Sequence, residues 1–288
     1  MPFSHTSHFS TSRSPFGLGL LGLLGFIFAM SPLSAAEEKQ ANHKGLDSVS
    51  LICDQERIVA GKPFLIGLHF IHKPGYHTYW KYSGTVGLPT DIQWKLPKGF
   101  VVSEFSWPHP ERVFMTNIPC NGYKRDVTLF AKVTPPKHLN QQNITFSANA
   151  SWMCCGKECN PSSGSFALKL PVSKTLAPSH DPRFKTAIKE SKFQTLSTCS
   201  LLIKADAAVI KVRIPLDKTN DEKLDQIEIF SKDGQISSDS KFSITRTSPK
   251  EILLTTTRAE RSPTKRSTLP LIIKIQNSYY RTNPSYKP

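Results

Sequence analysis

Short apolar or alternating runs separated by turn-forming residues dominate this 288-residue chain. In the first half, six runs have the length and alternation of β-strands: residues 49–53, 63–71, 92–96, 127–133, 144–153 and 165–172. Turn signals such as Pro74-Gly75 and Asn121-Gly122 lie between them, because Gly frees the backbone φ angle and Pro restricts it. Strands at this spacing, without helical periodicity, predict an all-β fold that begins with an immunoglobulin-like antiparallel β-sandwich.

The second half predicts a smaller β domain. Polar residues collect at 173–182, and Asp181-Pro182 is a start signal for a short helix over residues 183–193. Six further strand-like runs follow: residues 200–204, 208–214, 226–230, 242–246, 251–257 and 269–275. We therefore expect the sandwich over residues 49–173, a second β domain with its entry helix over 174–276, and a polar tail over 277–288.

The amino terminus has the pattern of a secretory signal peptide. An apolar run over residues 16–30 follows a polar start that contains Arg13 and precedes the small residues Ser34 and Ala36. The run is shorter than the roughly 20 apolar residues that span a membrane. We expect a signal peptide over residues 1–36, with an uncleaved anchor as the alternative, and a flexible lead-in over 37–48. No membrane span is expected after cleavage, and disulfides persist in the oxidising compartment beyond.

Composition narrows the classes of function. Hydrophobic residues make up 38% of the chain, which is enough for packed cores and argues against collagen or general disorder. The net charge is +15, but the basic residues are scattered, and the cluster at 258–266 lacks the aromatic residues of a nucleic-acid site. We expect no nucleic-acid partner and a basic surface that faces an acidic envelope or protein.

The densest chemical signal is the segment Cys154-Cys155-Gly156-Lys157-Glu158-Cys159. Cys155 and Cys159 flank a hairpin-like turn and can approach closely enough for a disulfide. The loop they close is short, so its entropic stabilisation is modest and redox chemistry explains the pair better than stapling. Lys157 favours a thiolate, which is the species that exchanges disulfides. An inert hairpin disulfide is the alternative.

The other cysteines leave several interpretations open. Cys154 is expected to be a buried strand residue that points away from Cys155, although three thiols so close together are also a candidate Cu(I) site. Zinc is disfavoured because no fourth ligand is visible, so no metal or other cofactor is expected. Cys53, Cys120 and Cys199 are either buried small hydrophobic residues or members of one long-range bridge.

Two aromatic-rich segments, residues 76–81 and 107–114, stand out from the strand pattern. Such residues are more often packing than a ligand site. Their histidines, His77 and His109, are candidates for acid/base chemistry near neutral pH. A serine hydrolase is excluded because Ser163-Gly164-Ser165 is not a nucleophile turn.

Five motifs then carry a family resemblance: residues 74–81 (Pro-Gly-Tyr-His-Thr-Tyr-Trp-Lys), 84–90 (Gly-Thr-Val-Gly-Leu-Pro-Thr), 107–112, 121–123 and 152–161. In this order they resemble the amino-terminal periplasmic domain of DsbD and ScsB-like thiol:disulfide interchange proteins, over residues 49–172. The resemblance implies that two cysteines pass reducing equivalents from a membrane donor to periplasmic clients. These clients include thioredoxin-like proteins, disulfide isomerases and cytochrome c maturation factors, and the ScsB branch implies a link to copper tolerance.

The same resemblance assigns residues. Cys155 and Cys159 correspond to the redox pair, and residues 112–115 lie where the family carries a cap, with Phe114 as the expected shielding ring and Arg112 beside it. Cys154 and Asn160 stand where aliphatic residues are usual. The family's membrane and thioredoxin-like domains are absent from the sequence, so we expect a stand-alone form that depends on a separate membrane donor.

The sequence thus predicts a periplasmic thiol:disulfide interchange protein, and a disulfide reductase if it is an enzyme. The alternative is a copper-handling or protein-docking module in which Cys154 contributes to a metal-binding or non-redox cysteine cluster. A structural protein with an inert bridge is the third hypothesis.

Overall fold

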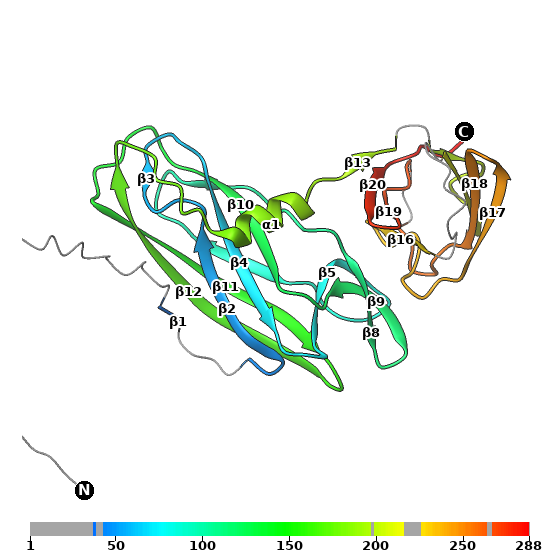
Figure 1. Cartoon of the computed structure of the whole chain (residues 1–288), viewed down its shortest axis with the longest axis horizontal. Coiled ribbons are helices and arrows are strands. Elements are labelled where there is room, and N and C mark those ends of the chain that lie inside the picture. The colour runs from blue at the N-terminus through cyan, green and yellow to red at the C-terminus, as the bar shows by residue number, and fades with distance from the viewer. Residues whose placement is uncertain (1–36, 39–42, 197–198, 216–225, 264–266, 288) are drawn as a thin grey trace, which may run out of the picture. The chain divides into compact units, whose positions relative to one another are not determined.

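The computed structural model describes residues 37–38, 43–196, 199–215, 226–263 and 267–287 (Figure 1). The expected signal peptide and residues 39–42 of the expected lead-in lie outside the described residues. The described chain is mostly β, with one short helix and two β domains, so the predicted fold class is confirmed. No helix among these residues is long and apolar enough to cross a membrane.

Two sheets form the first β domain. The smaller sheet has the order β2 (Leu46–Cys53), β4 (Phe64–His72), β10 (Val127–Thr134) and β7 (Val101–Val102). The larger has the order β1 (Glu37–Glu38), β12 (Cys159–Ser173), β11 (Asn143–Cys155), β5 (His77–Gly84), β9 (Ile118–Tyr123) and β8 (Glu111–Met115). In addition, β6 (Asp91–Lys95) pairs with β11, and β3 (Ile58–Val59) pairs in parallel with β12.

The core of this domain lies between the two sheets. Successive side chains of a strand point to opposite faces, so every second residue of β11 is buried. Phe146 and Trp152 of β11 join Leu51, Leu68 and Leu129 of the smaller sheet in one apolar cluster. This packing fixes the long hairpin of β11 and β12 along its length, up to the turn that carries the cysteine pair.

The helix α1 (Pro182–Glu190) covers the outer face of the smaller sheet (Figure 1). It begins as the sequence predicts: the Asp181 side chain accepts a hydrogen bond from the Arg183 backbone N–H, and Pro occupies the first turn. Phe184 and Ala187 pack against apolar side chains of β2 and β10. The helix is shorter than expected and ends at Glu190.

The second β domain contains two four-stranded sheets around its own apolar cluster. One has the order β13 (Gln194–Thr195), β20 (Ser278–Thr282), β19 (Leu271–Ile275) and β16 (Ile227–Ser231). The other has the order β14 (Ser200–Leu201), β15 (Val209–Pro215), β18 (Glu251–Thr257) and β17 (Phe242–Ser248). The expected polar tail therefore contains a paired strand, β20, whose half-buried tyrosines contribute to the packing.

Candidate functional site

The cysteine pair lies at the tip of the β11–β12 hairpin. Cys155 and Cys159 face each other in the strand register and form a disulfide, with their Cα atoms 4.1 Å apart. The Gly156 backbone N–H donates to the Glu158 carbonyl within the turn. The Asn160 amide donates to the Cys154 carbonyl at 3.4 Å. These bonds fix the turn, so a polar residue at 160 has a local structural use.

The two cysteines of the disulfide differ in exposure. Cys155 is the last residue of β11 and is 0% exposed, whereas Cys159, across the turn, is exposed. A thiolate arriving from solvent therefore reaches the Cys159 sulfur first. The buried partner sulfur is available only from within the protein.

Strand β5 determines the environment of each cysteine on β11. The register pairs His77 with Cys155 and Thr78 with Cys154, so the two cysteines lie on opposite faces of the sheet. Cys154 belongs to the core between the sheets, whereas Cys155 belongs to a separate apolar cluster. Burial raises the pKa of the Cys154 thiol from its ordinary value to about 12. Cys154 is therefore a protonated core residue at neutral pH.

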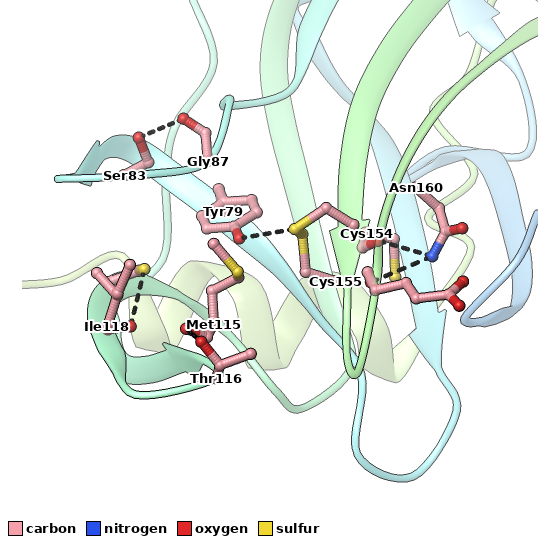
Figure 2. The surroundings of a disulfide bond; sticks show 12 residues. Tyr79, Ser83, Gly87, Met115, Thr116, Ile118, Cys154, Cys155 and Asn160 are labelled. Atoms are coloured by element: carbon pink, nitrogen blue, oxygen red, sulfur yellow. Dashed lines mark hydrogen bonds between the residues drawn. A yellow bond between two sulfur atoms is a disulfide. The ribbon is translucent and has the colours of Figure 1, made fainter.

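An apolar wall surrounds Cys155. Tyr79, Val113 and Cys120 form a buried cluster with it, and half-buried side chains pack against this cluster: Val86, Met115, Ile118 and Met153. Figure 2 shows Met115 and Ile118 on the same side of the disulfide as Tyr79, and Cys154 on the other side. The wall keeps water from the buried sulfur.

Tyr79 is the polar group that reaches the disulfide. Its hydroxyl lies 3.9 Å from Cys159 Sγ (Figure 2), and because a disulfide sulfur carries no proton, the phenol is the donor. The ring is 1% exposed, and burial raises the pKa of Tyr79 above its ordinary value, so the hydroxyl stays protonated. Gly87, with φ +92°, lies against this ring, because a Cβ there would be 2.1 Å from a ring carbon.

Comparison with known proteins agrees with this geometry. Residues 50–171 match the family described as "Thiol:disulfide interchange protein DsbD, N-terminal". These residues are therefore similar to a DsbD N-terminal domain. The fold is similar to the crystal structure of the N-terminal periplasmic domain of ScsB from Proteus mirabilis, with a TM-score of 0.62 and 13% identity over 88% of this chain and 100% of that chain. No curated protein matches the chain.

The expected cap residues Phe114 and Arg112 do not pack in the cluster of Cys155. Phe114 is 57% exposed. Arg112 donates to Asn121 Oδ1 at 2.6 Å and to the Ile229 carbonyl at 2.9 Å. Met115, in the same segment, is the residue that packs against the cluster of Cys155. The alternation of β8 distinguishes these faces, and β8 is not among the strands that the sequence pattern predicts.

The two candidate histidines have different surroundings. His77 is 4% exposed and its ring meets the Tyr79 ring edge-on, with centroids 5.1 Å apart. Burial lowers the pKa of His77 to about 4, so it is uncharged at neutral pH. His109 stacks on Tyr279 at 4.1 Å, and its Nε2–H donates to the Lys192 carbonyl at 2.7 Å. These contacts give His109 a structural role.

The remaining cysteines do not assemble a metal site. Among the described residues, no group of three or more His, Cys, Asp or Glu side chains is placed to hold a metal ion. Cys53, Cys120 and Cys199 are free and buried, so the long-range bridge that the sequence left open is not formed. Cys154 and Cys155 cannot chelate one ion together, because their side chains lie on opposite faces of the sheet.

Replacing Tyr79 with Phe is expected to raise the pKa of the Cys159 thiol in the reduced protein. The thiolate loses its hydroxyl donor, and a hydrogen bond to a charged group corresponds to about one pH unit. The measurement is a pH titration of thiolate ultraviolet absorbance or of the alkylation rate. Tyr280→Phe, on β20, is the control. An unchanged titration curve in Tyr79→Phe would show that the phenol does not stabilise the thiolate.

Proposed function

We propose that this chain is a periplasmic thiol:disulfide interchange protein that works through Cys155 and Cys159. The observation that carries the proposal is the asymmetry of the pair: an exposed cysteine with a phenol donor beside its sulfur, joined to a buried cysteine in an apolar wall. An inert hairpin bridge needs neither feature. The match of residues 50–171 to the DsbD N-terminal family supports the same chemistry.

The exchange proceeds through Cys159. In the reduced protein, the Cys159 thiolate attacks one sulfur of a client disulfide, forms a mixed disulfide and releases the other client sulfur as a thiolate. Cys155 then loses its proton and attacks Cys159 Sγ, which expels the second client thiolate and restores the Cys155–Cys159 bond. The client gains two electrons and two protons, and the pair is oxidised by the same amount.

A membrane thiol:disulfide donor would then return the pair to the dithiol by the reverse sequence. Thioredoxin-like proteins and disulfide isomerases are the proposed clients, as the family match suggests. The proposed compartment is the periplasm, which is where the similar domain of Proteus mirabilis ScsB resides by its description. In this proposal, residues 49–173 are the redox domain and the second β domain begins at 174.

Copper handling receives less support. A soft-metal site would need the three sulfurs of residues 154–159 to converge. Cys154 instead packs in the core on the far face of the sheet, with its thiol pKa raised by burial.

The reduction potential of the pair tests the proposal. The protein is equilibrated with glutathione or thioredoxin buffers, and each thiol is read by alkylation and mass spectrometry. A potential between about −120 and −270 mV is expected, as for working redox proteins. A bridge that resists reduction below about −300 mV would be structural and would refute the exchange function.

A further inference from the structure

The hairpin of β8 and β9, here called the cap hairpin, makes different contacts on its two faces. On one face, Val113 and Met115 of β8 pack with the cluster of Cys155. The alternate residue Arg112 lies on the opposite face, because neighbouring side chains of a strand diverge. That opposite face meets the second β domain, where Arg112 donates to the Ile229 carbonyl of β16. One face of the cap hairpin therefore packs around Cys155, while the other face contacts the second β domain.

A single hydroxyl of the second β domain joins the two segments that wall the disulfide. Ser238 Oγ accepts a hydrogen bond from the Thr85 backbone N–H at 2.9 Å and donates to the Pro119 carbonyl at 2.6 Å. Thr85 precedes Val86 and Gly87, which pack on the cluster and on the Tyr79 ring. Pro119 follows Ile118, which packs on the same cluster.

The close fit of Ser238 depends on a glycine. Gly84 has φ +95°, and a Cβ at this position would lie 2.1 Å from Ser238 Oγ. Ser238 itself is buried. The second β domain thus packs tightly against the backbone at Gly84, with no room for a side chain between them.

Arg112 provides the second attachment. Its guanidinium bonds to Asn121 across the cap hairpin and lies 5.0 Å from the centre of the Phe230 ring. The Asn121 amide in turn donates to the Tyr82 carbonyl of β5 at 2.8 Å. Through this chain of contacts, β16 of the second domain is connected to the cap hairpin and to the strand that carries Tyr79.

We propose that the second β domain acts as a clasp: it holds residues 84–87 and the cap hairpin in place beside the disulfide. Ser238 and Arg112 are its positioning residues. Neither residue touches the sulfur atoms. Each acts on the position of Val86, Met115 and Ile118, which set the access of a thiol to the pair. The proposal rests on the exchange function above and assigns to the second domain the control of that access.

Releasing the clasp is expected to speed the reaction of the disulfide with a small thiol. The protein is treated with excess dithiothreitol, and the rate of disulfide reduction is followed by quenching and alkylation. Ser238→Ala and Arg112→Met each remove two hydrogen bonds. Each variant is therefore expected to be reduced at least about fivefold faster, which is the factor for the loss of one average hydrogen bond from the closed state. Ser243→Ala and Arg246→Met on β17 are the matched controls, since within the described residues Arg246 donates a hydrogen bond to the nearby Pro249 carbonyl.

Hydrogen exchange provides the second readout. In Ser238→Ala, amides of residues 84–88 and 115–120 should exchange faster, while those of β4 and β10 keep their protection. If the Ser238→Ala or Arg112→Met protein loses protection throughout, Arg112→Lys, which keeps the charge but not the two-pronged contact, replaces it in the rate measurement. If these variants showed wild-type rates of both disulfide reduction and amide hydrogen exchange, the clasp proposal would be overturned. If the exchange function fails, the reduction potential of the Cys155–Cys159 pair lies below about −300 mV. That result would not change the order of the dithiothreitol reduction rates among the variants, so the two failures can be told apart.

Discussion

Cys155→Ser is expected to accumulate a stable mixed disulfide between Cys159 and a client, and Cys159→Ser is expected to lose disulfide exchange altogether. Cys159, the exposed residue of the pair, makes the first bond to the client, and Cys155 is placed to break it. Without Cys159 the remaining thiol is sealed behind the apolar wall. The exchange rate should therefore fall more than about a thousandfold, the scale on which loss of an enzymatic nucleophile is felt.

The trapping measurement uses a thioredoxin-like client in its disulfide form, separation without reductant, and mass spectrometry of the linked peptides. Cys154→Ala is the matched control, because Cys154 is the neighbouring thiol on the core face of the sheet. It should exchange at nearly the wild-type rate. Efficient trapping by Cys159→Ser, or exchange that depends on Cys154, would reverse the assignment of the two roles.

The elements that the sequence predicts well are those with clear alternation. The β11–β12 hairpin is an example, since its apolar positions recur every second residue towards the other sheet. The cysteine pair at its tip is predictable for the same reason, because a short turn between two strands leaves its flanking residues face to face.

The strands that complete the site were not predicted. Strands β5 and β9 contain His, Pro, Asn or Gly residues, which weaken any alternation of apolar positions, and β8 has only five residues. Tyr79 and Met115 belong to them, and their burial comes from pairing with other strands and from the loop that covers them. Their burial therefore depends on tertiary contacts, which the local sequence pattern does not reveal.

In the cap segment, a difference of one residue along the strand decides which side chain faces the disulfide. The family resemblance places the cap at residues 112–115, and Phe114 is the aromatic ring expected there as the shield. Adjacent residues of a strand face opposite ways, so Phe114 is exposed while Met115 packs at the disulfide cluster. The contacts of Ser238 and Arg112 are harder still to foresee, because both residues bind backbone carbonyls, which have no sequence signature.

Gly122→Ala is expected to destabilise the first β domain by about 3 kcal/mol, at the upper end of the cost of overpacking. Gly122 of β9 faces β5, and a Cβ there would lie 2.2 Å from the Thr78 carbonyl oxygen and 3.0 Å from Val113. The carbonyl belongs to the backbone of a paired strand and cannot turn aside. Relief therefore requires β9 to move away from β5, which also separates the cap hairpin from Tyr79.

Denaturant unfolding, combined with the dithiothreitol reduction rate, measures both consequences of this substitution. Gly75→Ala is the matched control, because Gly75 has φ +81° with no atom near its missing Cβ, so backbone strain of about 1 kcal/mol is the only cost. The two glycines thus separate close strand approach from backbone conformation. If Gly122→Ala were no less stable than Gly75→Ala, β9 would not approach β5 so closely, and the apolar wall would need another support. If it were less stable and also reduced faster, the close approach of β9 to β5 would be what keeps the buried sulfur sealed.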